Sequence, residues 1–528
     1  MTKSCQKLRV PGYVFMIAMM SGCITLGPDF KKPEAPTTSW QTKDAGMSED
    51  QRKQAKWWKL FNDPVLNTLV QKAYRQNLPL QVAGLRIVEA RAQLGIAVGG
   101  FFPQTQQAQG SFSQEILSKN KALGESPDSN FRVGEIGFDA AWELDFWGRF
   151  RRGIEAAEAN LAANEADYDN ALVSLTAEVA RVYVTLRTAE QRLALARENI
   201  ILQEESLRIA KVRFDNGATS ELDYQQATYN LANTRALVPT QLRVIRQAKN
   251  ALSVLLGMPP TDLTEILGNA GSIPKAPDII TTGIPADLLR RRPDIRQAEF
   301  SAATQSALIG VAKTDLFPRL SLTGSIGLQT SDFAASNFSD LIDTDSMFVT
   351  AGPSVRWNIL NYGRIWNNIR VQDALFQQSL VNYRNTVLTA YQEVEDARVA
   401  FVQSKEESNL RNIGAIAAGR SAEISNIQYR EGTVSFQRVV DSERVLVSQQ
   451  DLWATTRGDI ALNLIAMYKA MGGGWEIRDG QAFISDENRN EMEERTYWSN
   501  QLEHPRELSW WEKLFNLTRF TAPWLQLW

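Results

Sequence analysis

The chain has 528 residues, 44% of them hydrophobic and 22% charged, so it can bury a large core. A formal net charge of −3 gives no electrostatic reason to expect a nucleic-acid partner. His504 is the only histidine and Cys5 and Cys23 are the only cysteines, which argues against a His/Cys metal site and against a Cys-His or Ser-His-Asp catalytic centre. Carboxylate chemistry stays open on counting alone, but we predict no enzyme and no cofactor.

The N-terminus has the layout of an export signal. Basic residues within the first nine positions precede a short apolar segment and the small pair Ser21 and Gly22. This pair directly before Cys23 resembles a bacterial lipobox, in which the cysteine is acylated and becomes the new N-terminus. We therefore expect residues 1–22 to be removed and Cys23 to carry lipid, which fixes a protein to a membrane without spanning it. Ile24 follows, where an aspartate would favour inner-membrane retention, so we expect outer-membrane delivery. An ordinary signal peptide with a chance cysteine is the alternative.

The segment 23–56 is predicted to be a lipidated N-terminus followed by a linker. Gly27–Trp40 contains proline and threonine without periodicity, which is typical of an extended linker. From Trp57 onward the pattern becomes helical, and a further helix is predicted to start at Asn77 and to run to about Val98 before two glycines.

The next segment alternates with a period of two. Over Glu135–Phe146, apolar residues alternate with acidic and small ones, which predicts a long strand. Gln104–Ser113 is a more polar partner strand, joined through a loop at Lys119–Asn130. A half-buried soluble sheet would give the same pattern. Acidic residues on one face of so long a strand also fit a transmembrane barrel that is apolar toward lipid.

Ile154–Phe214 is a stretch of 61 residues without glycine or proline. One continuous helix of this length would span about 90 Å, so we expect an elongated molecule. Its apolar residues recur in steps of three and four, as in a coiled coil. They are Leu172, Leu175, Val179, Val182, Leu186, Ala189, Leu193, Ala196 and Ile200. A second helix, Glu221 to Leu256, returns along the first, with Ser220 as its predicted cap. A spectrin-like or fibrous coiled coil is the simplest interpretation of this stretch alone.

The whole pattern then recurs at a constant offset of 215 positions, as in 357 − 142 for two tryptophans. The paired residues are Phe102 and Phe317, Trp142 and Trp357, Gly148 and Gly363, Phe214 and Tyr429, and Gly217 and Gly432. One offset across unrelated residue types indicates duplication of a whole unit. We divide the chain into a first repeat at 57–260, a second repeat at 261–475 and a C-terminal tail at 476–528.

The second copy repeats both signals, with alternation over Leu320–Gln329 and Val349–Asn358 and a second long helix. Gly414 and Gly419 interrupt this helix, so we expect a bend there that the first copy lacks. Each copy therefore supplies two strands and two long antiparallel helices. Four strands cannot close a barrel, since about eight are needed. Open sheet edges are not tolerated in lipid, so if the strands span a membrane, several chains must share one barrel.

Five motifs in a fixed order resemble those of the TolC/OprM outer membrane efflux proteins, in the lipoprotein branch that serves resistance-nodulation-division pumps. The resemblance covers roughly residues 23–475. The motifs are Gly27–Pro33 after the lipobox, Trp57-Trp58 with Phe61 and Asp63-Pro64, Glu143–Arg149, Leu288–Ile295 and Trp357–Arg364.

The resemblance implies a mainly α-helical fold with a membrane β-barrel. Three chains would close a trimeric 12-stranded β-barrel in the outer membrane, continued by a 12-helix coiled-coil tunnel through the periplasm. The short helices Asn62–Val98 and Thr261–Lys313 would belt the tunnel. The implied function is a passive, gated duct that exports small molecules such as drugs, toxic compounds or metal ions. The implied partners are a periplasmic adaptor protein, an inner-membrane pump and outer membrane lipid. The sequence does not name the cargo.

Two places are predicted to carry the mechanism. The hairpin tips are expected to meet the adaptor, although both glycines there could serve only the turn. The tip residues are Gly217, Ala218, Thr219, Ser220, Gly432, Thr433, Val434 and Ser435.

Relatives close the aperture with an apolar residue and an aspartate four positions apart, and the matching residues here are Gln437 and Asp441. Gln437 departs from that pattern, which weakens a hydrophobic seal. Three converging copies of Asp441 would repel one another, so they would need cations or the nearby Arg430, Arg438 or Arg444. The alternative is a solvated aspartate paired locally with Arg438 or Arg444.

The tail lies outside the repeat, and its charged segment Glu487–Glu494 is predicted to be poorly ordered. Two functional alternatives to the efflux duct remain at this stage. A periplasmic tethering lipoprotein would explain the long helices and the lipobox, but not the strands or the repeat. An outer membrane duct of a protein secretion system would explain all of them and differs only in its cargo.

Overall fold

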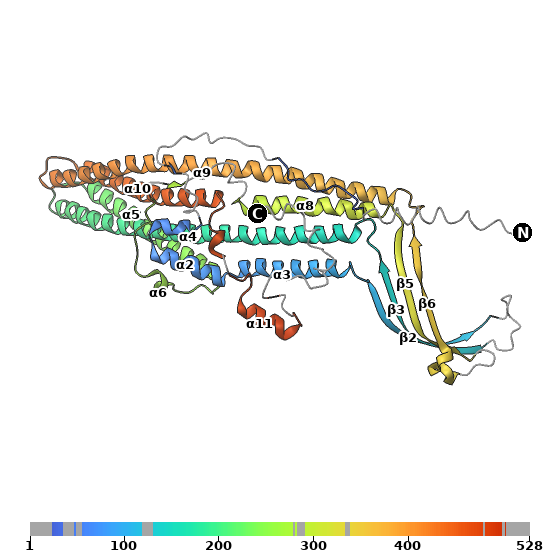
Figure 1. The fold of residues 1–528 in the computed structure, drawn as a ribbon. Helices are drawn as coiled ribbons and strands as arrows, with labels where there is room; N and C mark the ends of the chain where they lie inside the picture. The colour runs from blue at the N-terminus through green and yellow to red at the C-terminus, as the bar shows by residue number, and fades with distance from the viewer. Residues whose placement is uncertain are drawn as a thin grey trace, which may run out of the picture.

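The computed structural model describes residues 24–34, 47–48, 55–118, 130–277, 280–281, 291–332, 338–478, 481–498 and 502. The molecule is elongated. Long helices lie side by side in its body, and a curved sheet extends from one end of the body (Figure 1). The predictions on residues 1–22 and Cys23, on the first three residues of the Leu288–Ile295 motif and on the tail beyond residue 502 lie outside the described residues.

Two very long helices form the body. Helices α4 (Arg149–Asp215) and α9 (Arg364–Arg430) have 67 residues each, which corresponds to about 100 Å. Their antiparallel partners α5 (Glu221–Leu255) and α10 (Phe436–Ala470) have 35 residues each. The bounds of the second pair lie 215 residues beyond those of the first, while the residues that separate one repeat from the next stay predictions. In the described part of the chain, no helix combines the length and apolar character needed to cross a membrane.

The predicted interruption of the second long helix is wrong, because α9 continues through both of its inner glycines. A glycine inside a helix costs roughly 1 kcal/mol relative to alanine, which packing can offset. A Cβ at Gly419 would only reach ordinary contact with Leu446 of α10, and one at Gly414 would meet Gln449. Both glycines therefore lie where α9 and α10 pack together.

Two shorter helices extend the partners end to end. In space, helix α3 (Leu78–Gly99) begins where α5 ends, and the Asn77 side-chain amide joins the two by donating to the Leu255 carbonyl at 3.0 Å. Helix α8 (Pro293–Thr314) follows the end of α10, because the Arg292 guanidinium donates to the Ala470 carbonyl at 2.6 Å. The second contact repeats the first at the 215-residue offset.

The predicted belt of short helices is therefore wrong for α3 and α8. Both run lengthwise beside α4, and α8 also packs on α9, as Figure 1 shows. The shorter elements η2 (Trp57–Phe61), α2 (Pro64–Gln76) and α6 (Thr264–Leu267) lie near the junction of these helices instead. A helix break in a sequence does not reveal whether the chain turns away or is continued by another helix.

The main core lies at this junction. Trp57 and Trp58 are fully buried, and the Trp57 ring stacks on Tyr468 of α10 at 5.7 Å between ring centroids. The Tyr183 hydroxyl donates to Asp63 at 2.7 Å, while the other oxygen of Asp63 caps the first N–H groups of α2. The Trp57–Pro64 motif thus binds the start of the first repeat to α4 and to the end of the second repeat.

The tail contains a helix that the sequence did not predict. After η5 (Trp475–Arg478), helix α11 (Asp486–Arg495) covers the segment predicted to be poorly ordered. Ser485 caps it by accepting from the N–H of Asn488, and the Asn488 amide donates to Gln81 of α3 at 3.1 Å. Tertiary contacts therefore order a segment whose composition favours disorder.

The N-terminal segment 24–34 is docked rather than a free linker. The N–H of Leu26 donates to the carbonyl of Trp147 at 3.2 Å, and its own carbonyl accepts from Arg152 at 3.1 Å. Gly27 has a φ of +99°, and a Cβ there would lie 2.5 Å from Cα of Gly310 on α8. Residue 27 must therefore be glycine for the segment to lie this close to the helix.

The sheet joins the two halves of the chain. Its strands are β2 (Thr105–Ile116), β3 (Asn130–Glu143), β5 (Arg319–Ser331) and β6 (Met347–Arg356), antiparallel in the order β2-β3-β5-β6. The four predicted strands are confirmed, with β3 paired to β5 across the repeat boundary. Two short helices, η3 (Phe338–Ile342) and η4 (Thr344–Ser346), connect β5 to β6. Separately, β1 (Met47–Ser48) pairs in parallel with β4 (Ile280–Thr281).

Strand β3 ends at Glu143, earlier than predicted, because the next residues serve as the cap of α4. The Asp145 carboxylate accepts from the N–H groups of Phe150 and Arg151 and from the Arg151 guanidinium. Both side chains of this ion pair are almost fully buried. The motif at Glu143–Arg149 therefore forms the turn from the sheet into the long helix.

One face of the sheet is apolar and exposed. Phe138, Ile326 and Val349 are neighbours across three strands and are 59%, 53% and 61% exposed. The opposite face is polar, with Glu135 and Asp139 accepting from glutamines of β2. A sheet in water buries its apolar face, so this arrangement fits a sheet whose apolar face meets lipid.

Helices α4 and α10 lie close together at Gly458. A Cβ at this position would lie 2.4 Å from the Thr188 hydroxyl oxygen and 2.9 Å from its methyl carbon. We expect Gly458→Val to lower the free energy of unfolding by about 1–3 kcal/mol through overpacking. Gly95→Val is the matched control, since a Cβ at Gly95 on α3 meets open space. Chemical unfolding followed by helical circular dichroism would contradict this account if both variants lost equal stability.

Candidate functional site

The two hairpin tips are built as the same turn. Gly217 and Gly432 have φ values of +68° and +76°, the left-handed region that glycine adopts readily. The N–H of Ala218 donates five residues back to Arg213 at 2.8 Å, and that of Thr433 donates to Gln428 at 2.9 Å. This is the hydrogen-bond pattern of a Schellman helix end. The glycines therefore have the turn role, and a contact with an adaptor stays a prediction.

The predicted capping bond of Ser220 is not formed. Ser220 lies at the cap position of α5 with an extended backbone, but its hydroxyl does not accept from the first N–H groups of the helix. The neighbouring Thr219 hydroxyl donates to the Asp223 carboxylate instead. Ser435 lies at the equivalent position before α10, likewise without a side-chain cap.

The predicted gate residues come together only in part. Gln437 and Asp441 lie on the exposed face of α10, and the Gln437 amide donates to the Asp441 carboxylate at 2.8 Å. Arg444 is the nearest cation, with its guanidinium 4.0 Å from Asp441. Arg430 instead pairs with Glu205 of α4 at 3.2 Å, and Arg438 makes no ion pair with any described residue. The structure therefore supports a Gln437–Asp441–Arg444 group, while its role as an aperture stays a prediction.

A buried polar network behind this group escaped the sequence reasoning. Glu443 of α10 is 2% exposed, and its carboxylate accepts from Ser206 of α4 at 2.5 Å, Asn230 of α5 at 3.1 Å and Asn426 of α9 at 3.2 Å. Burial raises the pKa of Glu443, and the three donors lower it only in part. The missed signal was position, because Glu443 follows the buried residues Val439 and Val440 in steps of four and three.

The tip beyond this network has only a small apolar core. The core contains one or more residues from each of the four helices: Ala210, Ala227, Tyr429, Phe436, Val439 and Val440. Arg213 of α4 adds a bond to the Tyr429 carbonyl at 2.9 Å and lies over the Tyr429 ring at 4.6 Å. Regions with few buried contacts open at lower free energy than a large core, so the tip should open more easily than the junction.

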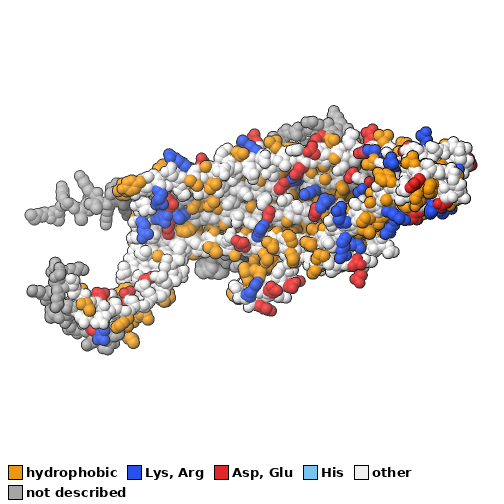
Figure 2. All heavy atoms as spheres, turned by 180° about the vertical axis from the view of Figure 1, so that it is seen from behind, with side chains coloured by type: hydrophobic (Ala, Val, Ile, Leu, Met, Phe, Trp, Pro, Cys, Tyr) orange, Lys and Arg blue, Asp and Glu red, His pale blue; other side chains and the backbone are white. Residues whose placement is uncertain are grey.

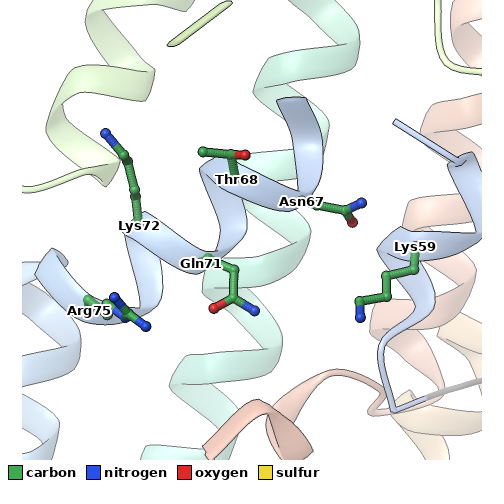
Figure 3. A pocket seen from close by; sticks show the side chains of 6 residues that line it. All are labelled: Lys59, Asn67, Thr68, Gln71, Lys72 and Arg75. Atoms are coloured by element: carbon green, nitrogen blue, oxygen red, sulfur yellow. The ribbon is translucent and has the colours of Figure 1, made fainter. Parts of the chain in front are cut away.

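A basic hollow lies at the junction, between η2 and the exposed side of α2 (Figure 3). Its volume is about 390 Å³, and the residues that line it are Lys59, Asn67, Thr68, Gln71, Lys72 and Arg75. Its three cationic side chains form no ion pair with the described residues, so the hollow suits an anionic group. Within the described part of the chain, no group of three or more His, Cys, Asp or Glu side chains could hold a metal ion.

Glu158 on α4 makes the stability of the body depend on pH. Burial, together with the nearby charge of Glu155, raises the pKa of Glu158 from 4.5 to about 7. The folded protein keeps this proton up to about pH 7, whereas the unfolded chain releases it near pH 4.5. The folded state therefore loses stability as the pH rises through this window, by at most about 3 kcal/mol.

We expect Glu158→Gln to match the native protein at pH 5 and to be more stable at pH 8. Thermal unfolding at a series of pH values checks this, with Glu89→Gln as the control, because Glu89 is an exposed carboxylate on α3. Parallel pH profiles for the native protein and Glu158→Gln would contradict the assignment.

Fold and site together define a protein of the membrane-channel class. The sheet exposes an apolar face and ends in two unpaired edge strands, and the helical body carries further hydrophobic side chains on its surface (Figure 2). The family model of the outer membrane efflux proteins matches residues 69–258 and 284–473, two stretches that are 215 residues apart at both ends.

Individual relatives agree with this match. The solvent efflux pump outer membrane protein SrpC of Pseudomonas putida is 32% identical, over 88% of this chain and 98% of that protein. The cation efflux system protein CusC of Escherichia coli is 28% identical, with the same coverage. The solved outer-membrane channel OprN has a TM-score of 0.79 and 33% identity, covering 86% of this chain and all of that one.

The chain belongs to the outer membrane efflux protein family, which confirms the resemblance drawn from the motifs. It has the fold of the outer membrane channels, and it is an outer membrane channel component of efflux systems. The family is one of channels and not of enzymes.

Proposed function

We propose that three copies of the chain form one passive duct through the outer membrane and the periplasm. The observation that carries this proposal is the sheet with four strands, two open edges and one exposed apolar face. Four strands are too few for a barrel, whereas three sheets joined edge to edge, β6 of one copy beside β2 of the next, give twelve. Closure removes the unpaired edges that lipid does not tolerate.

The helical body supports the same assembly. Exposed apolar residues form a stripe along α9, spaced mostly by seven or eleven residues: Val381, Leu388, Val399, Leu410 and Ile413. These spacings return to the same side of a helix, so the stripe needs a covering partner along its length. A second copy of the chain is the partner that would also close the sheet. In such a trimer, the polar face of the sheet would line a water-filled interior.

The N-terminal dock supports lipidation at Cys23. Segment 24–34 begins directly after this cysteine and is held against Trp147 and Arg152, where the sheet meets the helices. A lipid on Cys23 would thus lie near the level at which the apolar sheet enters the membrane. The other end of the body would extend into the periplasm, with the tips toward a periplasmic adaptor and an inner-membrane pump.

The cargo we propose is a small molecule: a drug, a toxic compound or a metal ion. Relatives are named for efflux of solvents and of cations, so the family's ducts serve different pumps. The pump and the adaptor would select the cargo. A protein-secretion duct is the alternative, and a tethering lipoprotein leaves the sheet unexplained.

The test is single-channel conductance of the purified oligomer in a planar bilayer, with its mass measured by light scattering. We expect a trimer that conducts. A monomer, or a folded trimer without conductance, would contradict the duct and would favour a tether. Heat-modifiable migration of the membrane-extracted protein adds a direct check, because a closed barrel resists unfolding in detergent.

A further inference from the structure

Glu443 is the buried charged residue of the tip, and the gate group does not include it. It lies two positions after Asp441 on α10, but it points to the opposite side, into the space between the four long helices. It makes no ion pair with any described residue. Its carboxylate is therefore held only by the three neutral donors on α4, α5 and α9.

The origin of the donors matters more than their number. Helices α4 and α5 form one hairpin, and α9 and α10 form the other. The bonds from Ser206 and Asn230 cross between the hairpins, whereas the bond from Asn426 stays within Glu443's own hairpin. If the hairpins separate at the tip, these two bonds of Glu443 must break, whereas its bond from Asn426 can remain.

We propose that Glu443 is a latch that holds the α9–α10 hairpin against the α4–α5 hairpin and keeps the tip narrow. A buried carboxylate without donors is strongly unfavourable, so separation is opposed until water or a docked partner supplies new donors. The same turn of α10 carries Asp441, so the latch also fixes the position of the gate group. The role as a gate latch rests on the proposed duct function.

Three other contacts cross between the hairpins nearby: the contact of the Ser206 hydroxyl with the Asn426 side-chain oxygen at 3.0 Å, the Glu205–Arg430 pair, and the bond from Arg213 to the Tyr429 carbonyl. Glu205 and Arg430 are both exposed, so this pair is screened by water and salt. Glu443 differs because it is buried and bonded to both helices of the other hairpin. Loss of Glu443 should therefore loosen the tip without separating it fully.

The experiment measures the distance between the hairpins directly, and it does not depend on conductance. Spin labels are placed on the exposed positions Gln225 of α5 and Gln428 of α9 in the full-length protein. A second pair, at Gln93 of α3 and Asp373 of α9, reports the end near the sheet. Labelled copies are diluted among unlabelled ones, so that one oligomer carries at most one pair. Pulsed electron resonance then gives the distance distribution.

The variants separate the latch from general packing. We expect Glu443→Leu and the double variant Ser206→Ala/Asn230→Ala to broaden or lengthen the tip distance while the second pair keeps its native distance. Asn426→Ala removes the bond within the hairpin and a second acceptor of the Ser206 hydroxyl, but it keeps both crossing donors of Glu443, so it should leave the tip nearly native. Glu423→Leu is the matched control, since Glu423 is an exposed carboxylate of α9 that pairs with Arg420 on its own helix and lies outside the gate group.

Three results would overturn the latch: a native tip distance in both Glu443→Leu and the double variant, equal broadening in Asn426→Ala or Glu423→Leu, or broadening at both label pairs. Conductance is measured separately. A loosened tip in a protein that does not conduct would leave the latch intact and refute the duct. A conducting protein whose tip distance stays native in the Glu443 variants would support the duct and refute the latch.

Discussion

Replacing Asp169 by leucine is expected to cause a large loss of stability in the body. Asp169 lies on α4 with no exposed side-chain surface, and its carboxylate accepts from Arg478 of η5 and from Arg296 of α8, the latter at 3.4 Å. Removing one partner of a buried charge network typically costs about 3–5 kcal/mol, because the remaining charges lose their partner. Both arginines retain some contact with water, so we expect about 3 kcal/mol in chemical unfolding.

The same substitution should also loosen the start of the tail. Since Arg478 ends η5 just before the tail, Asp169→Leu should make the chain after residue 478 more sensitive to limited proteolysis. Asp167→Leu is the control, because Asp167 is partly exposed, 3.6 Å from Arg86, and bonded to Gln297 at 3.1 Å. Such an exposed pair contributes at most about 1 kcal/mol. Equal losses in the two variants would show that burial does not decide the effect.

The sequence predicted the parts of the fold that depend on periodicity. The two-residue alternation predicts each strand from its own residues alone. The constant 215-residue offset predicts the repeat by comparing the chain with itself. Neither signal requires knowledge of which segments contact each other. The motif around Trp57 predicted the start of the helical pattern, but its place in the core of the junction was seen only in the structure. These signals also carried the family resemblance.

The parts that the sequence could not predict depend on contacts between distant segments. Asn77 and Arg292 have different side chains, an amide and a guanidinium, yet each donates to the last carbonyl of a helix 178 residues away. The end-to-end junctions therefore cannot be predicted from a residue pattern. Helix α11 has a composition typical of disorder, and Ser485 and Gln81 order it from outside. Glu443 was not singled out in the sequence, whereas its position on the buried face of α10 decides its role.

The candidate gate shows the same limit. Spacing placed Gln437 and Asp441 on one face of a helix, and their hydrogen bond follows from that spacing. Which arginine neutralises Asp441 could not be predicted, because Arg430 turns toward Glu205 on α4. Arg444 remains, three positions after Asp441 on the same helix. Gln437 and Asp441 are both polar, so a seal predicted at this point would act through charge and not through apolar contact.

Asp441→Ala is expected to enlarge the single-channel conductance and to reduce the cation selectivity of the duct. In a trimer, three Asp441 carboxylates would face the axis, where they attract cations and hold Gln437 and Arg444 across the opening. Alanine removes the negative ring and releases both partners. The reversal potential in a salt gradient measures the selectivity, and the current amplitude and flicker measure the opening.

Asp215→Ala is the control, because Asp215 is an exposed carboxylate at the end of α4 that pairs with Lys211 at 3.1 Å. Small, flickering native currents that grow in Asp441→Ala, but not in Asp215→Ala, would place the constriction at Asp441. Equal, well-resolved currents in all three proteins would retain the duct and remove Asp441 from its gate. The constriction would then have to lie elsewhere on the interior surface, and the Glu443 latch would control the spacing of the hairpins without controlling the aperture.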